Sequence, residues 1–271
     1  MSVSTAAEPA HRAKGPSPTR AAPLRLVDPA VISIVGFVTL WWLASLGQPP
    51  YILPSPVAVL DAFVRVAFET GELWLALGQT MVALLIGGAL SLAVGVPLGM
   101  LMGSRKRVER ALEMYVNGLY VAPVSALTPL FIYWLGIDLA PRVATIFVFA
   151  TPQVVITCYR GARSVQGTYM EVARAFRATE RQRFTKVLLP YELPYIVTAM
   201  RLGLGQAVKG AVLAELLVSS TGLGLLLSEF SHRFDTASLI AVLFTLMFVG
   251  IISTGVLGRV ERALTPWSTR T

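Results

Sequence analysis

Long apolar stretches alternate with short polar ones along most of the chain. A membrane-spanning helix needs about 20 mostly apolar residues to cross roughly 30 Å of hydrocarbon. Six stretches approach this length, although the first and fourth are short, and they cover about residues 30–47, 76–102, 112–135, 142–159, 197–218 and 238–258. The pattern predicts an all-α, polytopic membrane protein, with a transmembrane domain at 30–262 built as a bundle of about six helices.

Glycines and prolines interrupt several of these apolar stretches. Gly95, Gly99 and Gly103 recur every four residues, so one side of that helix would let another backbone approach closely. Prolines are tolerated in lipid when neighbouring helices re-satisfy the freed backbone groups. Bent, mutually packed helices are therefore predicted around Pro97, Pro123, Pro129 and Pro152.

A basic stretch between the fourth and fifth apolar stretches has the signals of two short helices. Thr168 and Glu171 have capping-box spacing, in which a hydroxyl and a carboxylate each accept a hydrogen bond from an otherwise unpaired backbone N–H. The first helix can therefore begin at Thr168. A second capping box follows at Thr179 and Gln182.

Pro190 is predicted to end the second helix, because its ring nitrogen has no proton to donate and its ring restricts the preceding residue. The segment at about 163–195 would then form a helix-turn-helix elbow. Apolar side chains lie among its arginines, and they are Val172, Ala173, Phe176, Phe184, Val187 and Leu188.

The distribution of basic residues predicts the orientation. With the N-terminus inside, 18 of the 23 Lys and Arg residues fall in cytoplasmic segments, and only Arg65, Arg142 and Arg233 fall outside. The positive-inside rule favours this arrangement, with both termini cytoplasmic. Residues 1–29 contain five prolines and no apolar run, which predicts a disordered cytoplasmic tail, and 263–271 would form a second tail.

Composition narrows the class of protein. Charged residues make up 14% of the chain, against about 25% in soluble domains, and 55% of residues are apolar. The net charge of +8 fits insertion bias and attraction to anionic membrane lipid, so it needs no nucleic-acid partner.

The residues that catalysis would need are scarce. The two histidines, His11 and His232, lie far apart in the sequence, and the single Cys158 is expected to be a packed apolar residue. No zinc site or catalytic triad can be assembled from them. The chain has no phosphate-binding Gly-rich loop, so it would carry no cofactor, and any ATP would have to be bound by another chain.

The fifth apolar stretch contains Arg201 near its inner end and two charged residues farther along. Lys209 and Glu215 are six residues apart, about 120° around a helix, so they are not expected to pair with each other. Lys209 could line a path and attract an anion, or it could pair with carbonyls of another helix or extend toward the headgroups. For Glu215 the options are a gate or a role in helix packing.

Two segments would lie on the outer side. Ser55 is a predicted N-cap of a short surface helix from 56 to about 68, with proline at its first position. The second segment is a loop at 219–237. Either could be plain solvated surface.

The basic stretch and its neighbours resemble the EAA loop of ATP-binding-cassette importer permeases, whose pattern is Glu-Ala-Ala, three residues, Gly, nine residues, Ile-x-Leu-Pro. This chain keeps the spacing, with Val172 and Arg177 as departures at the second residue and the glycine, and the matching positions are Glu171, Ala173, Val187, Leu189 and Pro190. Further likeness lies at 95–99, 129–137 and 264–267. The branch it resembles most imports nitrate, taurine and aliphatic sulfonates.

The resemblance implies a type I importer permease in a bacterial inner membrane. In that family the elbow inserts into a separate ATPase subunit, which binds ATP and magnesium, two permeases pair around a path, and a periplasmic or extracellular binding protein delivers the solute. A homodimer is the default here. The residues expected to couple to the ATPase are Thr168, Glu171, Val172, Ala173, Phe176, Arg177, Leu189 and Pro190, and Glu215 corresponds to a glutamate common in the family.

Three alternatives stay open. The elbow could lie on lipid headgroups as an amphipathic loop. The chain could be a secondary transporter, although no internal repeat or midplane carboxylate is evident, or it could be a membrane scaffold or enzyme assembly subunit. A small anion is favoured as the solute because of Lys209.

Overall fold

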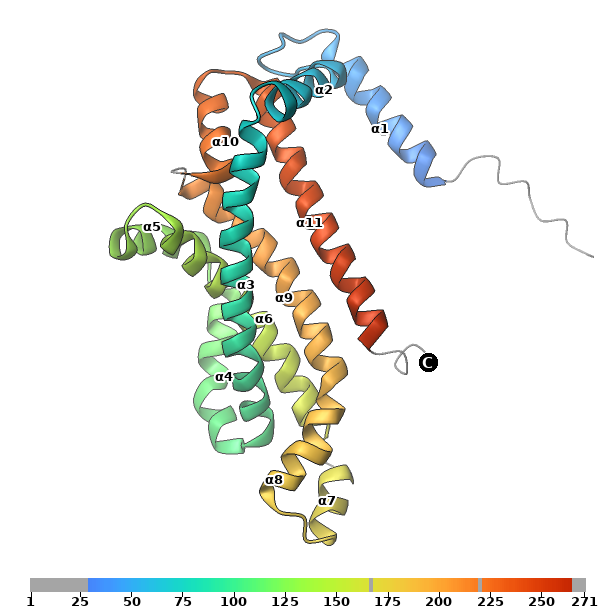
Figure 1. The fold of residues 1–271 in the computed structure, drawn as a ribbon, viewed down its shortest axis with the longest axis vertical. Coiled ribbons are helices and arrows are strands. Elements are labelled where there is room, and N and C mark those ends of the chain that lie inside the picture. The colour runs from blue at the N-terminus through green and yellow to red at the C-terminus, as the bar shows by residue number, and fades with distance from the viewer. Residues whose placement is uncertain (1–28, 166–167, 219–220, 265–271) are drawn as a thin grey trace, which may run out of the picture.

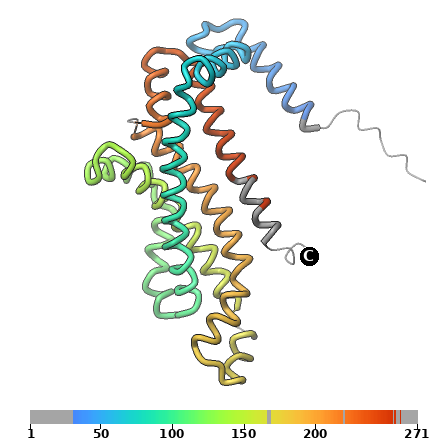
Figure 2. Tube along the Cα trace, viewed as in Figure 1, coloured from blue at the N-terminus to red at the C-terminus, as the bar shows by residue number. Residues whose placement is uncertain are grey.

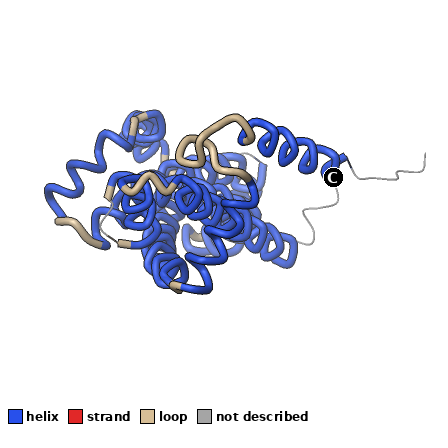
Figure 3. Tube along the Cα trace, turned by 90° about the horizontal axis from the view of Figure 1, so that it is seen from above, coloured by secondary structure: helices blue, strands red, loops and turns tan. Residues whose placement is uncertain are grey.

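The computed structural model describes residues 29–165, 168–218 and 221–264. Regular structure in these ranges is entirely helical, and Figure 3 shows helices joined by short loops. In chain order the elements are α1 (Pro29–Ser45), α2 (Pro56–Val64), the π-helix η1 (Arg65–Glu69), α3 (Glu72–Ser104), α4 (Lys106–Val121), α5 (Val124–Leu135), α6 (Leu139–Ser164), α7 (Thr168–Ala175), α8 (Glu180–Arg183), the π-helix η2 (Phe184–Leu188), α9 (Leu189–Leu217), α10 (Gly222–His232) and α11 (Thr236–Leu264).

The two expected tails fall almost wholly outside the described residues. Of the segment 1–29, only Pro29 is described, as the first residue of α1. Of the segment 263–271, only the first two residues are described, and they end α11.

Four long helices, α3, α6, α9 and α11, form the bundle and run along the long axis of the molecule (Figure 1). Within the described ranges, four helical runs are long and apolar enough to cross a membrane. They coincide with four of the six apolar stretches, and α6 packs against both α3 and α9. The all-α architecture and the positions of these spans are as predicted.

The glycines of α3 lie against α6. A Cβ added at Gly99 would lie 2.6 Å from the Val155 carbonyl oxygen, and one added at Gly103 would lie 2.5 Å from the Ala162 Cβ. Real Cβ atoms do not approach other atoms this closely, so the two helices can pack at this distance only with glycine at both positions. The close approach predicted for Gly95, Gly99 and Gly103 is confirmed, with α6 as the partner helix.

The stretch 112–135 is broken into two helices at Pro123, where the sequence predicted a bend. It forms α4 and α5, whose axes differ in direction by 97°. Pro123 lies at the break, and Ala122 before it has the non-helical angles φ −59° and ψ 140°. The physical reason is that the proline ring removes a backbone donor and excludes helical dihedral angles from the residue before it. As a result α5 extends sideways from the bundle (Figure 1).

Helix α1 is a short apolar helix that diverges from the bundle, as Figure 2 shows. Its 17 residues span about 25 Å at 1.5 Å per residue, which is slightly less than the hydrocarbon core. Its contacts are near its C-terminal end, where the Trp41 ring lies 5.9 Å from that of Phe244 on α11. Large apolar side chains are exposed along it, including Phe37 and Leu40. Such a surface is typical of contact with lipid or another helix.

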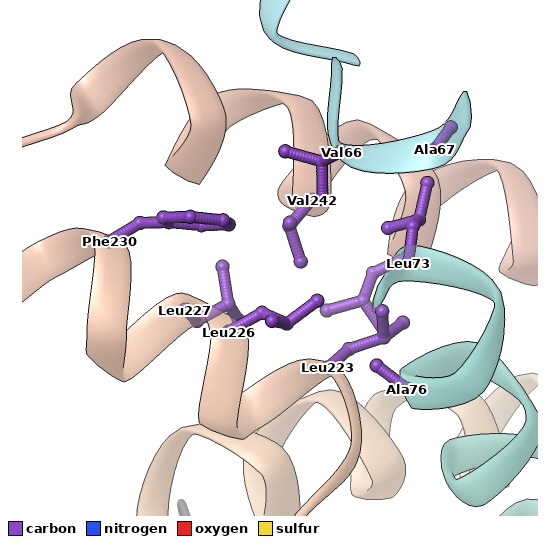
Figure 4. Packing of buried hydrophobic residues seen from close by; sticks show 10 residues of the cluster. Val66, Ala67, Leu73, Ala76, Leu223, Leu226, Leu227, Phe230 and Val242 are labelled. Carbon is purple, nitrogen blue, oxygen red and sulfur yellow. The ribbon is translucent and has the colours of Figure 1, made fainter. Parts of the chain in front are cut away.

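A compact apolar cluster closes the end of the bundle near α2 and α10. Figure 4 shows side chains from α3, α10, α11 and η1 meeting there, among them Leu73, Leu223, Phe230 and Val242. Ser55 caps α2 by accepting a hydrogen bond from the Ala58 N–H at 3.2 Å, as predicted. The expected loop at 219–237 is wrong in one respect, because it contains the 11-residue helix α10.

Candidate functional site

The predicted elbow lies at the opposite end of the molecule from α2 and α10 (Figure 1). Its second capping box is confirmed, because the Gln182 N–H donates to Thr179 Oγ1 at 3.3 Å and the Thr179 N–H donates to Gln182 Oε1 at 2.9 Å. The side chain of Thr168 lies outside the described residues, so the first capping box stays a prediction.

Arg177, in the glycine position of the motif, makes the sharp turn that ends α7. Its φ of 52° is left-handed, a conformation that glycine adopts without strain and other residues rarely adopt. The Arg177 N–H donates to the Arg174 carbonyl at 2.9 Å, and the Ala178 N–H donates to the Ala173 carbonyl at 3.0 Å. These two bonds are those of a Schellman C-cap. The elbow therefore turns as a glycine would make it turn, with arginine in the strained position.

Pro190 does not end the second helix, contrary to the prediction. The chain stays helical from Glu180 to Leu217 through α8, η2 and α9, and Pro190 is among the first residues of α9. The preceding turn is a π turn, in which the Leu189 N–H donates to the Phe184 carbonyl five residues earlier. A proline is tolerated in the first turn of a helix, where its missing N–H would have no regular partner, and the wider π turn provides such a start within a continuous helix.

The two faces of α7 differ. Tyr169, Val172 and Phe176 are exposed, with Phe176 the most exposed at 83%, and their spacing of three and four residues places them on one side of the helix. Met170 and Ala173 are buried against the rest of the chain. Ala173 and Phe176 were both expected to contact the ATPase, but the structure buries Ala173 and exposes Phe176.

The remaining elbow residues of the motif are at the surface. Glu171 and Arg177 are exposed on α7 and at its end, and Leu189 and Pro190 are exposed where α9 begins. The structure thus gathers these residues on one protruding segment. Their role in contact with another protein stays a prediction.

A buried ion pair joins three helices of the bundle at the other end. Arg142 Nη1 of α6 donates to Glu215 Oε1 of α9 at 2.9 Å, and both side chains are at most 2% exposed. Thr80 of α3 donates to the same carboxylate oxygen at 2.9 Å. The second oxygen, Glu215 Oε2, accepts from the Gly224 N–H of α10 at 2.7 Å. Glu215 therefore links α3, α6 and the first turn of α10.

Sequence reasoning missed the partners of Glu215. The charge distribution assigned Arg142 to the outer side of the membrane and did not predict that its side chain is buried. A signal was present, since Arg142 and Glu215 carry opposite charges within or beside apolar stretches. Nothing local identifies a pair that is 73 residues apart.

Lys209 is exposed on α9, whereas its neighbours Ala207 and Gly210 are buried. A Cβ at Gly210 would lie 2.9 Å from the Phe149 Cβ of α6, so that side of α9 faces the bundle and Lys209 faces away from it. Among the described residues Lys209 has neither a hydrogen bond nor an ion pair from its side chain. As expected, it does not pair with Glu215.

Glu192, near the start of α9, is a buried carboxyl group that the sequence analysis did not single out. It is fully buried, and neither carboxylate oxygen has a hydrogen-bond partner in the described part of the chain. Gly161 of α6 lies beside it, because a Cβ there would be 2.7 Å from Glu192 Oε1. Cys158 is a buried thiol, as expected.

Comparisons with known proteins agree on one family. Residues 95–266 match the family described as binding-protein-dependent transport system inner membrane component. The chain is 30% identical over 232 residues to the formylaminopyrimidine transport permease protein ThiX of Halalkalibacterium halodurans, covering 85% of this chain and 92% of that protein. It is 26% identical over 249 residues to the taurine transport system permease protein TauC of Escherichia coli, covering 90% of each.

A solved structure shares the fold. An inward-facing conformation of the MetNI methionine ABC transporter superposes with a TM-score of 0.64 at 22% sequence identity. The match covers 73% of this chain and 98% of the chain in that structure.

Proposed function

This chain belongs to the family of binding-protein-dependent transport system inner membrane components and is a permease subunit of an ATP-binding-cassette importer, and we propose that it forms the translocation path for a small solute with an anionic group, such as nitrate, a sulfonate or taurine. It has the fold of a type I importer permease and is a non-catalytic membrane subunit. Relatives are named as permeases for taurine, nitrate, aliphatic sulfonates and formylaminopyrimidine, so the preference for a solute with an anionic group rests on Lys209.

The exposed apolar stripe of α7 is the observation that carries the coupling role. Tyr169, Val172 and Phe176 stand uncovered on a protruding elbow whose other α7 face is buried. Exposed aromatic residues of this kind are typical anchors of protein interfaces. We infer that the stripe inserts into a groove on a separate ATPase subunit that binds ATP and Mg²⁺. Glu171 and Arg177 lie at the edge of this contact.

The continuous helix behind the elbow explains how the contact acts on the bundle. The helical run Glu180–Leu217 has 38 residues, about 57 Å at 1.5 Å per residue. Leu189 and Pro190 lie within this run, so they join the elbow to α9. A displacement of the elbow by the ATPase would therefore move α9 as a lever, consistent with rigid-body switching between outward-facing and inward-facing states.

We infer that Lys209 faces the path between two copies of the chain. A lysine at the centre of a span costs about 2.5 to 3.5 kcal/mol on insertion scales, and such residues generally face a cavity or a partner. In this chain Lys209 points away from the helices that pack on α9. A homodimer would enclose the side chain, and its charge would then attract an anion.

The outer surface would receive the solute from a periplasmic or extracellular binding protein. Helices α2 and α10 lie together at the end of the bundle opposite the elbow (Figure 1). With the elbow cytoplasmic, these helices face outward and both termini lie inside, as the distribution of basic residues predicts. The chain is a multi-pass membrane protein, and we place it in the inner membrane of a bacterial cell.

The experiment that tests the coupling role is co-purification of the ATPase subunit with a Phe176→Glu variant. A charge at the centre of an interface is expected to reduce retention of the ATPase at least tenfold, because hot-spot residues contribute about 2 kcal/mol or more. Membrane insertion and solubilised yield should stay unchanged.

Phe68→Glu is the matched control. Phe68 is 69% exposed and lies on η1, at the other end of the molecule. It should leave ATPase retention at the wild-type level. If the Phe176→Glu variant also retains the ATPase, the elbow does not dock there, and the alternative in which it lies on lipid headgroups is favoured.

A further inference from the structure

A pocket opens between the inner side of the elbow and the end of α3, away from the exposed stripe of α7. Its cavity volume is about 650 Å³. Its floor is apolar and includes Met100, Leu101 and Leu188. No residue of the exposed stripe lines it, so it is a separate feature of the elbow.

Four arginines surround this floor. Arg105 comes from the end of α3, Arg174 from α7, and Arg181 and Arg183 from α8, with Glu180 as the one acidic residue among the lining groups. Arg183 Nη2 pairs with Glu180 at 3.2 Å. The pocket thus carries three positive charges beyond its own neutralising pair.

These charges are available to a ligand. The side chains of Arg105, Arg174 and Arg181 form no hydrogen bond or ion pair within the ranges that the structure describes. The Nε–H of Arg183 is buried without an acceptor. A buried unpaired donor is unfavourable, and guanidinium groups match phosphate oxygens well in geometry. The rim therefore fits a phosphate group.

The apolar floor indicates an amphiphile in preference to a free phosphate. Leu101 lines the pocket and is 43% exposed, and Leu90 and Val94 are exposed on the same side of α3, within about 40° of one another around the helix. An apolar track thus leads from the arginines along a membrane-spanning helix. A free phosphate would not contact these apolar side chains, whereas an acyl chain would cover them.

We propose that this pocket binds the phosphate headgroup of an anionic phospholipid, whose acyl chain lies along the exposed side of α3. Basic pockets at the ends of membrane helices bind such headgroups. The lipid would join Arg105 of α3 to Arg174 and Arg181 of the elbow, and so hold the elbow against the bundle. The proposal does not depend on which solute is carried.

The test measures retained lipid by native mass spectrometry. The full-length permease is purified with its ATPase from nanodiscs of phosphatidylglycerol and phosphatidylcholine, and bound phosphatidylglycerol is compared between wild type and Arg105→Gln/Arg181→Gln. Removal of two charges should lower retention at least about tenfold. The matched control, Arg65→Gln/Arg233→Gln, removes two exposed arginine charges at the other end and should retain lipid.

Further arms separate charge, fold and ligand source. Arg105→Lys/Arg181→Lys keeps both charges and should retain most of the lipid, which shows that the loss in the glutamine variant is not unfolding. Leu101→Ser should also weaken retention, because it interrupts the apolar track. Equal retention in wild type and the glutamine variant overturns the proposal. So does displacement of the lipid by millimolar inorganic phosphate, which indicates a free-anion site. Lipid that is retained by the permease purified alone but lost from the complex with the ATPase also overturns it, because that result indicates a protein interface.

Discussion

Arg142 of α6 and Glu215 of α9 form a 2.9 Å ion pair whose side chains are 2% and 1% exposed. The carboxylate also accepts hydrogen bonds from Thr80 and from the Gly224 N–H, so each of its oxygens has a partner. This pair connects the central helices of the bundle to α10, at the end opposite the elbow. The ion pair therefore has a structural role, in which each buried charge is compensated by the other.

Glu215→Ala should therefore destabilise the protein by about 3 to 5 kcal/mol, because it leaves the Arg142 charge buried and unpaired. Thermal unfolding of the permease in detergent would measure this. The exposed pair of Arg233 and Glu229 provides the control, since Glu229→Ala should change stability by about 1 kcal/mol or less. If the double variant Arg142→Met/Glu215→Met is less stable than Glu215→Ala, the uncompensated charge is not the cause.

Arg177→Gly should stabilise the elbow by about 1 to 2 kcal/mol, because glycine adopts the left-handed conformation without the steric cost that arginine carries. Hydrogen exchange of the Ala178 amide, which donates to the Ala173 carbonyl, would report it as slower exchange. Ala175→Gly, at the last residue of α7, should have the opposite effect, by up to about 1 kcal/mol. Faster exchange in Arg177→Gly would show that the arginine side chain supports the turn.

Gly99→Ala should destabilise the packing of α3 on α6 by about 1 to 3 kcal/mol, because the new Cβ would lie 2.6 Å from the Val155 carbonyl oxygen. Gly118→Ala is the matched change on α4, where an added Cβ meets nothing within 4 Å. It should be neutral or stabilising by up to about 1 kcal/mol. Thermal unfolding of the two variants measures this difference in stability. Similar melting temperatures would contradict the close approach of α3 to α6 at Gly99.

Lys209→Met should reduce the initial rate of uptake of an anionic solute about tenfold at low ionic strength, since a fixed positive charge raises the local anion concentration. Uptake into vesicles that contain the reconstituted transporter measures it, with ATPase retention as the check on assembly. Lys209→Arg keeps the charge and should retain most of the rate. Unchanged uptake by Lys209→Met would place the side chain at lipid headgroups instead.

Local signals predicted much of this fold. The apolar stretches located the long helices, Ser55 and Thr179 marked helix starts, and the glycines of α3 marked a close contact. Each of these depends on residues within one or two turns of each other, so a sequence contains enough information to identify it.

The errors have physical causes that lie beyond one turn. Pro123 predicted a bend but not its size of 97°, because the size and direction of the bend depend on how α5 packs on α6. The π turn before Pro190 let a helix continue where a proline normally ends it. The burial of Arg142 and Ala173 depends on distant segments, which no local pattern specifies.

The π turn of η2 also fixes the direction in which the elbow points. A π turn accommodates one more residue than a regular turn, and each residue of an α-helix advances by 1.5 Å and rotates by about 100°. The extra residue therefore rotates the segment that precedes η2 about the axis of α9, relative to its position in a regular α-helix. Deleting one residue from Phe184–Leu188 would leave the helix intact yet rotate Phe176 roughly a quarter-turn away from its present azimuth.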